Sequence, residues 1–373
     1  MIAAPTNLCI VGMGPDTYGV LAGDTKVAFV GGEAVQQVLL ARAWRDLGIE
    51  VSMVLADSPH AQEHRVEGIR IIPGYRTTAG IPVLRFLHPR MTGIFKALKR
   101  ADAQAYYQSP AGAVTGFVAN YCRRHGRQFA FRIASDANCV PGQQLIKLWR
   151  DRKIFEYGMR HASLIAAQTQ QQQALLRCHY RLESELVNMV AEPAELPAPD
   201  SQDIDVLWVG SYRQVKRPEA LIEIARALPN LRFAMVGGMH GDMQDYYYRL
   251  TAAARLLPNI AVHGPVPYRQ VGGLFDRAKV LANTSIVEGF PNTFLQAWMR
   301  GIPVATTFDP DGLIVRQGLG AAAGEPSQLV PVLAAMVGEE AKRRSEAARI
   351  RSFALQEYSA PAIARKYLKL LAR

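Results

Sequence analysis

Short apolar runs of strand length alternate with helix-length amphipathic segments in the C-terminal half of the chain. Four such runs occupy residues 205–210, 231–236, 260–263 and 280–283. The segments between them are long enough for crossover helices, and strands joined in this way lie parallel in a sheet covered on both faces. The pattern predicts a parallel α/β sheet whose ligands bind at the carboxyl ends of the strands.

A less regular form of the same pattern occupies the N-terminal half. Its apolar runs fall at residues 8–11, 51–55, 104–107, 128–133 and 164–167. Because these runs also alternate with helical spacing, they predict a second α/β sheet.

A proline-rich stretch with almost no bulky apolar side chain joins the two halves. This composition is typical of a linker. We therefore expect a first domain over residues 1–191, a linker over 192–203 and a second domain over 204–358. A last helical pattern covers residues 359–373. The pattern does not show where this helix docks, and the first domain is one candidate.

The composition is that of a globular enzyme. Of 373 residues, 49% are hydrophobic and 20% are charged, which excludes a disordered or fibrous protein. No apolar run approaches the ~20 residues of a spanning helix, and the N-terminus lacks a signal-peptide pattern. The four cysteines are scattered and predict neither a disulfide framework nor a zinc site. We expect a cytoplasmic protein.

A net charge of +11 favours anionic partners. Nucleic acid is not expected, because no nucleic-acid-binding motif accompanies the charge. Between Arg65 and Arg100, eight basic residues face one acid. The apolar residues of 91–98 share one helical face, with the cations of 96–100 beside them. Two interpretations remain open: a helix at the anionic inner face of the membrane, or a core-facing helix with a solvated basic side.

A glycine pair precedes the first long helical pattern. Gly31 and Gly32 stand directly before Glu33 and a helix-spaced series of apolar residues. A glycine entry lets a ligand approach the backbone, and the free amides of a helix start attract anions. A tight turn without a ligand explains the pair equally well.

Three cations follow the first strand of the second domain. Arg213, Lys216 and Arg217 come just after the run 205–210. Positive charge at this end of a parallel strand would stabilise a departing pyrophosphate, whose developing charge dominates the cost of breaking a sugar–phosphate bond. Lys216 is therefore a candidate catalytic residue. The alternative is a set of solvated loop cations.

The most informative segment runs from Glu288 to Gln296. Thr293 and Gln296 have capping-box spacing, which predicts a helix that begins near Asn292 or Thr293. Its free amides would add a second anion-stabilising element beside Lys216. Glu288 would accept hydrogen bonds from sugar hydroxyls. For Gln296, a capping role and a ligand contact both remain open.

Two further acidic positions are candidates for chemistry. Asp136 follows the run 128–133 and belongs at the carboxyl edge of the first sheet. There it would position or deprotonate an acceptor hydroxyl, or cap local amides. Asp309 and Asp311 imitate a metal-binding Asp-x-Asp pair, but they lie in a loop, so we predict a structural role and no metal site.

The segment 288–296 resembles the Glu-x7-Glu signature of the family 4 retaining glycosyltransferases, with Gln296 in place of the second glutamate. The Gly31–Gly32 turn resembles the N-terminal glycine loop of that family, and Gly237–Gly238 resembles its mid-domain glycines. Residues 263–268 resemble the segment that lies against the nucleotide base. The likeness spans nearly the whole chain and is strongest over residues 205–320.

This resemblance implies a GT-B architecture, in which two Rossmann-like α/β domains with parallel sheets face each other across a cleft. It also implies a nucleotide diphosphate sugar as donor, with no metal or other cofactor. Lys216 would bind the diphosphate, Glu288 the sugar and Gln296 the ribose hydroxyls. The other substrate-binding residues that we infer are Gly31, Gly32, Arg213, Gly237, Val266, Gly289, Phe290, Asn292, Thr293 and Leu295.

Two departures from the family pattern lower the expected donor affinity. Ser211 stands where the family usually has arginine, so Arg213 would have to supply that charge. Gln296 still accepts a hydrogen bond, but it offers no charged bidentate acceptor to a ribose diol.

We therefore expect a retaining glycosyltransferase that acts on a hydroxyl of a glycan or lipid-linked glycan in cell-surface or exopolysaccharide synthesis. One rival is a non-catalytic subunit that binds sugar nucleotides or glycans. Another is a sugar-nucleotide epimerase on the same fold. The presence of both Lys216 and Glu288 argues against the non-catalytic subunit.

Overall fold

The computed structural model describes residues 4–12, 14–24, 31–81, 84–198, 201–239, 241 and 243–372. The chain divides into two compact units. The first contains described residues up to Val190 together with those from Ala360 onward, and the second contains Ala191–Ser359. Residues 199 and 200 of the expected linker, like residue 373 of the final helical pattern, lie outside the described residues.

The first unit is built on one sheet. Its strands are β1 (Asn7–Val11), β2 (Glu50–Leu55), β3 (His64–Val66), β4 (Ile69–Pro73), β5 (Ala105–Gln108), β6 (Gln128–Arg132), β7 (Leu164–Ala167) and β8 (Glu185–Leu186). The order across the sheet is β3-β4-β2-β1-β5-β6-β7-β8. Neighbouring strands are parallel except β3 and β4. All five apolar runs of the N-terminal half form strands, which confirms the predicted α/β sheet.

The hairpin of β3 and β4 was not predicted. Its two-residue turn consists of Glu67 and Gly68, with φ angles of 50° and 80°. Positive φ at both central positions gives the turn the twist that a tight hairpin requires. Arg42 and Arg45 both pair with the Glu67 carboxylate, at 2.7 and 3.3 Å. These contacts hold an unusual turn residue in place.

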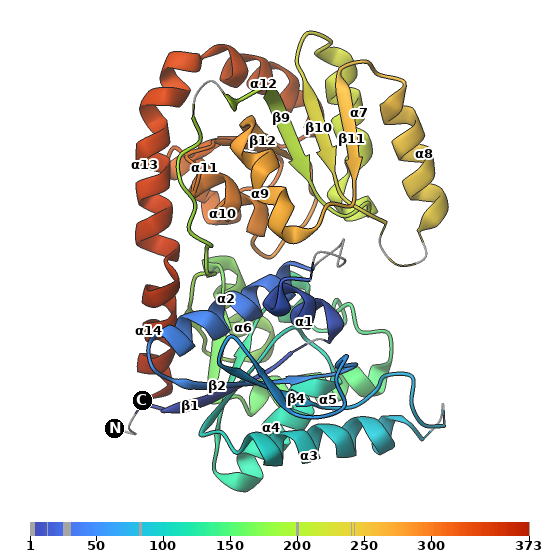
Figure 1. Cartoon of the computed structure of the whole chain (residues 1–373), viewed down its shortest axis with the longest axis vertical. Coiled ribbons are helices and arrows are strands. Elements are labelled where there is room, and N and C mark those ends of the chain that lie inside the picture. Colours follow the sequence, from blue (N-terminus) through green and yellow to red (C-terminus); the bar gives the residue numbers. More distant parts are fainter. Residues whose placement is uncertain are drawn as a thin grey trace. The chain divides into compact units, whose positions relative to one another are not determined.

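Helices cover both faces of this sheet (Figure 1). They are α1 (Pro15–Ala22), α2 (Gly32–Asp46), α3 (Thr92–Ala101), α4 (Ala113–His125), α5 (Trp149–Arg160), α6 (Gln170–Tyr180) and α14 (Ala360–Leu371). Helices α1, α2 and α14 lie on one face, and α3, α4 and α5 lie on the other. Apolar side chains of the second group close the main core of the unit over β1, β5 and β6.

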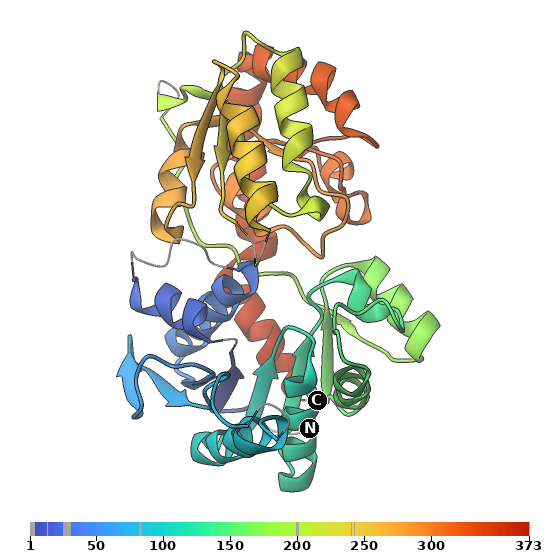
Figure 2. The same cartoon turned by 90° about the vertical axis from the view of Figure 1, so that its right-hand side faces the viewer.

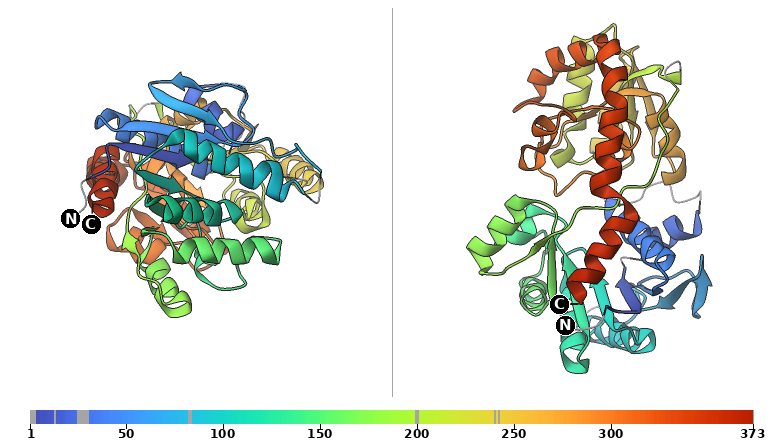
Figure 3. Two further views of the ribbon diagram at one scale, coloured as in Figure 1. Left: turned by 90° about the horizontal axis from the view of Figure 1, so that it is seen from below. Right: turned by 90° about the vertical axis from the view of Figure 1, so that its left-hand side faces the viewer.

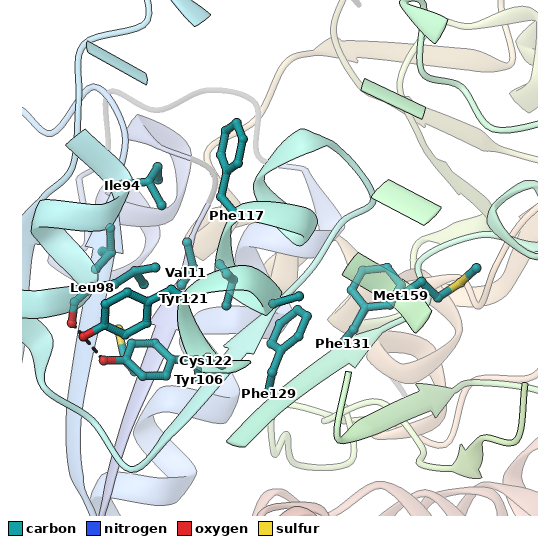
Figure 4. Packing of buried hydrophobic residues seen from close by; sticks show 14 of the residues in the cluster. Val11, Ile94, Leu98, Tyr106, Phe117, Tyr121, Cys122, Phe129, Phe131 and Met159 are labelled. Carbon is teal, nitrogen blue, oxygen red and sulfur yellow. Dashed lines mark hydrogen bonds between the residues drawn. The ribbon is translucent and has the colours of Figure 1, made fainter. Parts of the chain in front are cut away.

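Helix α3 turns its apolar side into this core. Ile94 and Leu98 are buried in it, while Met91 and Phe95 pack against it. Figure 4 shows Ile94 and Leu98 together with the aromatic rings of the cluster. The structure favours the second of the two interpretations, because the same four apolar side chains are already used in packing. The alternative, a core-facing helix with a solvated basic side, describes α3.

The basic residues of this region are less concentrated in space than along the chain. Arg65 pairs with Glu50, whereas Arg70 and Arg100 both reach Glu63. The remaining cations of α3 lie on its exposed side. With Arg100 and two glycines, they line an open hollow of about 570 Å³.

Helix α14 completes the other face of the first unit. It packs on α2, where the Trp44 indole donates a hydrogen bond to the carbonyl oxygen of Ala364 at 3.2 Å. The Tyr367 ring meets the rings of Trp44 and Tyr107 edge-on, at centroid distances of 5.8 and 5.6 Å. The end of the chain, dark red in Figure 3, therefore belongs to the core of the first unit.

The described residues of the second unit also form a single sheet, and all its strand pairs are parallel. Its strands are β9 (Ile204–Val209), β10 (Phe233–Val236), β11 (Ile260–Gly264), β12 (Ala278–Asn283), β13 (Val304–Thr306) and β14 (Gly320–Ala322). The order is β11-β10-β9-β12-β13-β14. All four predicted strands are present. β13 and β14 were missed because runs of three residues carry no readable periodicity.

Helices flank the second sheet as well (Figure 2). They are α7 (Pro218–Ala227), α8 (Gln244–Arg255), α9 (Tyr268–Asp276), α10 (Asn292–Trp298), α11 (Leu313–Arg316), α12 (Leu329–Gly338) and α13 (Glu340–Tyr358). Helices α7, α8 and α12 share a buried apolar cluster with the strands. Since β9 and β12 are central neighbours, the loops after them meet at one edge of the sheet.

Candidate functional site

The loops that follow β9 and β12 are tied together at the carboxyl edge of the second sheet. The amide of Ile286 donates to the carbonyl oxygen of Val215 at 2.9 Å. The Thr284 hydroxyl donates to the carbonyl oxygen of Lys216 at 2.8 Å and accepts a hydrogen bond from the Trp208 indole at 3.1 Å. These bonds fix the path of the Lys216 loop against the end of β12.

Lys216 and Glu288 form a direct ion pair, although 72 residues separate them. The Ser285 hydroxyl donates to the same Glu288 oxygen at 2.7 Å and so fixes the carboxylate. The two paired side chains are 19% and 11% exposed. They are therefore largely enclosed, yet a ligand at the sheet edge can still reach them.

Ser211 has a specific local role. It is buried, and its hydroxyl oxygen accepts a hydrogen bond from Arg213 Nε at 3.0 Å. Within the described part of the chain, the terminal nitrogens of Arg213 have no further partner. The serine that replaces the usual arginine thus orients a nearby guanidinium. The third cation, Arg217, lies 3.5 Å from the Glu325 carboxylate.

Helix α10 begins at Asn292, within the range that the sequence predicts. The predicted capping box is wrong, because the N-cap residue is Pro291 and no side chain caps the helix. Thr293 and Gln296 lie inside the helix instead, where both side chains are half-buried. The first-turn amides at this end consequently have no side-chain cap, which leaves them able to bind an anion.

Two predicted contact residues in this segment are explained by packing. Phe290 lies in an aromatic cluster, with ring centroids 6.1 Å from Trp298 and 5.6 Å from Tyr358. Leu295 is buried in the core of the second unit. Burial excludes a ligand contact through the Leu295 side chain, so only its backbone remains available. Gly289 follows Glu288 in the chain and is buried.

The glycine at the end of β10 is required by the backbone itself. Gly237 has a φ of +153°, and a Cβ atom there would lie 1.7 Å from the carbonyl oxygen of Gly210. The close approach of these two strand ends explains the glycine without a ligand. Val266 lies in the loop between β11 and α9, and its side chain is half-buried.

In the first unit, Gly31 is the N-cap residue of α2 and Gly32 is its first residue. No atom lies within 4 Å of the position that a Gly31 Cβ would occupy. Neither close packing nor positive φ explains this glycine, since its φ is −65°. Glu33 pairs with the buried Arg132 at the end of β6, which anchors the turn at the carboxyl edge of the sheet.

Asp136 follows β6, as predicted, and opens a short helical turn. Its carboxylate accepts a hydrogen bond from the Gln172 side-chain amide at 2.9 Å. In the second unit, Asp309 accepts from the backbone amides of Ile314 and Val315, at 2.8 and 3.2 Å. Asp309 therefore binds two backbone amides of α11, whose N-cap residue is Gly312. In the parts of the chain that the structure describes, no cluster of acidic, histidine and cysteine side chains could hold a metal ion.

Sequence reasoning missed the residues that support the ion pair. Thr284 and Ser285 are buried polar residues directly after an apolar strand. Buried hydroxyls need hydrogen-bond partners, so this position is a readable signal of a built polar site. Trp208 gave no such signal, because a tryptophan in an apolar strand is expected to pack in the core.

The site lies within a segment that matches a family model. Residues 194–313 match the family model of glycosyl transferases group 1. This group 1 segment contains Lys216, Glu288 and the loops that join them. It covers less than half of the chain, and no curated protein sequence matches the chain significantly.

Solved structures resemble the chain over nearly its whole length. The sucrose-phosphate synthase of Thermosynechococcus elongatus aligns with a TM-score of 0.76 at 16% identity, covering 98% of each chain. HepE of Anabaena, solved with UDP and glucose, aligns with a TM-score of 0.73 at 15% identity, covering 99% of each. The lipopolysaccharide outer core galactosyltransferase WaaB aligns with a TM-score of 0.62 at 14% identity, covering 98% of this chain and 99% of that chain.

These likenesses confirm the predicted fold class, which is GT-B with two Rossmann-like parallel-sheet domains. The group 1 match supports a glycosyltransferase and agrees with the family resemblance of the 288–296 segment. No helix in the described residues is both long and apolar enough to cross a bilayer.

Proposed function

We propose that this protein transfers a sugar from a nucleotide diphosphate donor to a hydroxyl of a glycan or lipid-linked glycan. The observation that carries the proposal is the contact between Lys216 and Glu288 at the carboxyl edge of the second sheet. A cation and a sugar-binding carboxylate must meet where the sugar–phosphate bond breaks, and here they touch.

In the proposed donor site, positively charged groups bind the diphosphate and a neutral side chain binds the ribose. The Lys216 ammonium has three donor hydrogens, so it can keep its bond to Glu288 while donating to a diphosphate oxygen. Arg213, held by Ser211, adds a second cation, and the amides at the start of α10 add a partial positive charge. Together these groups would stabilise the leaving diphosphate, the most effective place for electrostatic catalysis. Gln296 would accept a hydrogen bond from the ribose.

Retention of the anomeric configuration is proposed from the family likeness. In that reaction the departing phosphate itself takes the proton of the acceptor hydroxyl. The sugar–phosphate bond breaks, the new glycosidic bond forms on the same face of the sugar, and no separate base is required. Asp136 is proposed to position the acceptor, and the open Gly31 turn would admit a ligand to the backbone. We propose cytoplasmic action in polysaccharide synthesis, with reversible attachment to the inner face of the membrane.

Thermal unfolding with a panel of nucleotide diphosphate sugars tests the donor proposal. A ligand that binds only the folded protein at a hundred times its Kd stabilises it by about 2.7 kcal/mol, which should raise Tm by about 5 °C or more. UDP-glucose leads the panel, because HepE was solved with UDP and glucose. The matching nucleoside monophosphates serve as controls that lack the diphosphate. A donor that shifts Tm without transfer or hydrolysis would favour the non-catalytic subunit, and isomerisation without acceptor would favour the epimerase.

Transfer is expected to persist in excess chelator. The cations and helix-start amides supply the positive field that a divalent ion supplies at other phosphate-transfer sites. The measurement is initial rate with and without EDTA, followed by added Mg²⁺ or Mn²⁺. Loss of activity in EDTA that either ion restores would contradict metal independence and would direct attention back to Asp309 and Asp311.

A further inference from the structure

Two segments of the first unit expose apolar side chains that the core does not use. Leu84 lies just before the helical turn Phe86–Met91 that precedes α3, and Leu87 lies within that turn. Leu145, Leu148 and Trp149 lie just before or at the start of α5. Leu145 is 87% exposed and Trp149 is 72% exposed. We call these five residues the apolar surface. Exposed apolar groups gathered in this way mark interaction sites.

The two segments are fixed against the core and against each other. Phe86 and Ile146 pack on the core of the first unit, so their neighbours Leu87 and Leu145 are left pointing outward. The Arg150 guanidinium lies 3.4 Å from the centroid of the Phe86 ring. This contact joins the two segments, so the apolar surface is held in place by the fold of the first unit.

Positive charge surrounds the apolar surface. Arg85, Lys147 and Arg152 flank it, and among the described residues no carboxylate oxygen lies within 4.0 Å of their charged nitrogens. Asp151, the acid in the second segment, is already paired with Arg150 at 2.8 Å. Leucine and tryptophan beside unpaired cations match the interface of an anionic bilayer, where apolar groups enter the acyl boundary and cations meet lipid phosphates.

We propose that the apolar surface docks the first unit on an anionic lipid bilayer, with Trp149 entering the interface. This inference deepens the proposed membrane attachment by moving it from α3, whose apolar side is buried, to a surface that is free. The cations that flank this surface are complementary in charge to the phosphates of an anionic leaflet, which favours lipid as the occupant.

The tryptophans offer a direct readout. The chain has four, and Trp44, Trp208 and Trp298 are at most 2% exposed. Any change in tryptophan fluorescence on mixing folded protein with vesicles therefore reports on Trp149. We expect phosphatidylglycerol-containing vesicles to shift its emission to shorter wavelength, and lipids brominated on the acyl chain to quench it. Neutral phosphatidylcholine vesicles should do neither. Trp149→Phe should abolish both signals.

Vesicle co-sedimentation of three variants completes the test. Leu145→Ser with Leu148→Ser should reduce partitioning into anionic vesicles at least tenfold. The matched control, Tyr248→Ser with Leu256→Ser, changes equally exposed residues of the second unit and should bind like the wild type. The third variant carries alanine at all three cations of 96–100. Loss of binding only in this last variant would overturn the proposal and assign the contact to α3.

Three other results would also overturn it. One is the absence of wild-type binding to anionic vesicles. The second is binding that leaves Trp149 open to an aqueous iodide quencher. The third is self-association of the wild type that the double leucine variant loses, since the apolar surface would then join two copies. Vesicle binding without sugar transfer would contradict the proposed activity alone, and transfer without vesicle binding would contradict this inference alone.

Discussion

Lys216→Ala is expected to lower kcat/KM for sugar transfer about a hundredfold, which corresponds to about 3 kcal/mol of lost transition-state stabilisation. The reason is that the ammonium, which contacts the Glu288 carboxylate, is proposed to lie where the leaving diphosphate develops its charge. Initial rates with the donor found in the thermal panel measure the effect. A loss in kcat rather than an increase in KM alone would show that the lysine acts mainly on the transition state.

A matched variant controls for the loss of a lysine. Lys342→Ala removes an exposed lysine of α13 that is also paired with a glutamate, at 3.0 Å. Its activity should equal that of the wild type. Near-wild-type turnover in purified, folded Lys216→Ala protein would remove Lys216 from the proposed site.

Glu288→Ala is expected to reduce transfer by a similar factor of about a hundred. The carboxylate is proposed to hold the donor sugar, and its loss also leaves the Lys216 ammonium without its protein partner. Glu223→Ala, at an exposed carboxylate of α7 that pairs with Arg226, is the matched control. Equal rates for Glu288→Ala and wild type would contradict the sugar-binding role.

A double variant that combines Lys216→Ala with Glu288→Ala distinguishes a role in the reaction from a role in packing. If Lys216 and Glu288 served only to join the two loops, their removal should lower Tm while the remaining activity per folded molecule stayed high. If both act on the donor, the double variant should be folded and inactive, and its loss should be smaller than the product of the two single losses because the residues contact each other.

The sequence predicted the central strands of both sheets, because parallel strands covered by helices on both faces are near-continuous apolar runs. Prediction from the sequence failed where contacts between distant parts of the chain determine the local structure. The Glu67–Gly68 turn depends on arginines from α2, which no local pattern contains. For α3, the amphipathic pattern fits a protein core and a membrane surface equally well, and only the fold shows that Ile94 and Leu98 are buried.

The charged residues of the candidate site were predicted from the sequence, whereas the residues that support them were missed. Lys216 and Glu288 follow strands that sequence analysis found, and neighbouring parallel strands bring their loops together. The Thr284 hydroxyl acts through a partner far away in the chain, whereas the Ser285 hydroxyl contacts Glu288, three residues on. The role of Thr284 depends on strand order, which the alternation of runs does not specify.

The position of α14 has a consequence for how the protein is made. The ribosome completes residue 190 long before it reaches Ala364 and Tyr367, so the indole of Trp44 and the ring of Tyr107 stay uncovered while the second unit is synthesised. The first unit to emerge is thus the last to be finished, contrary to the usual N-terminal-first order. An isolated first domain that ends at residue 190 would lack part of its core, and a stable version needs residues 360–372 supplied through a designed connection.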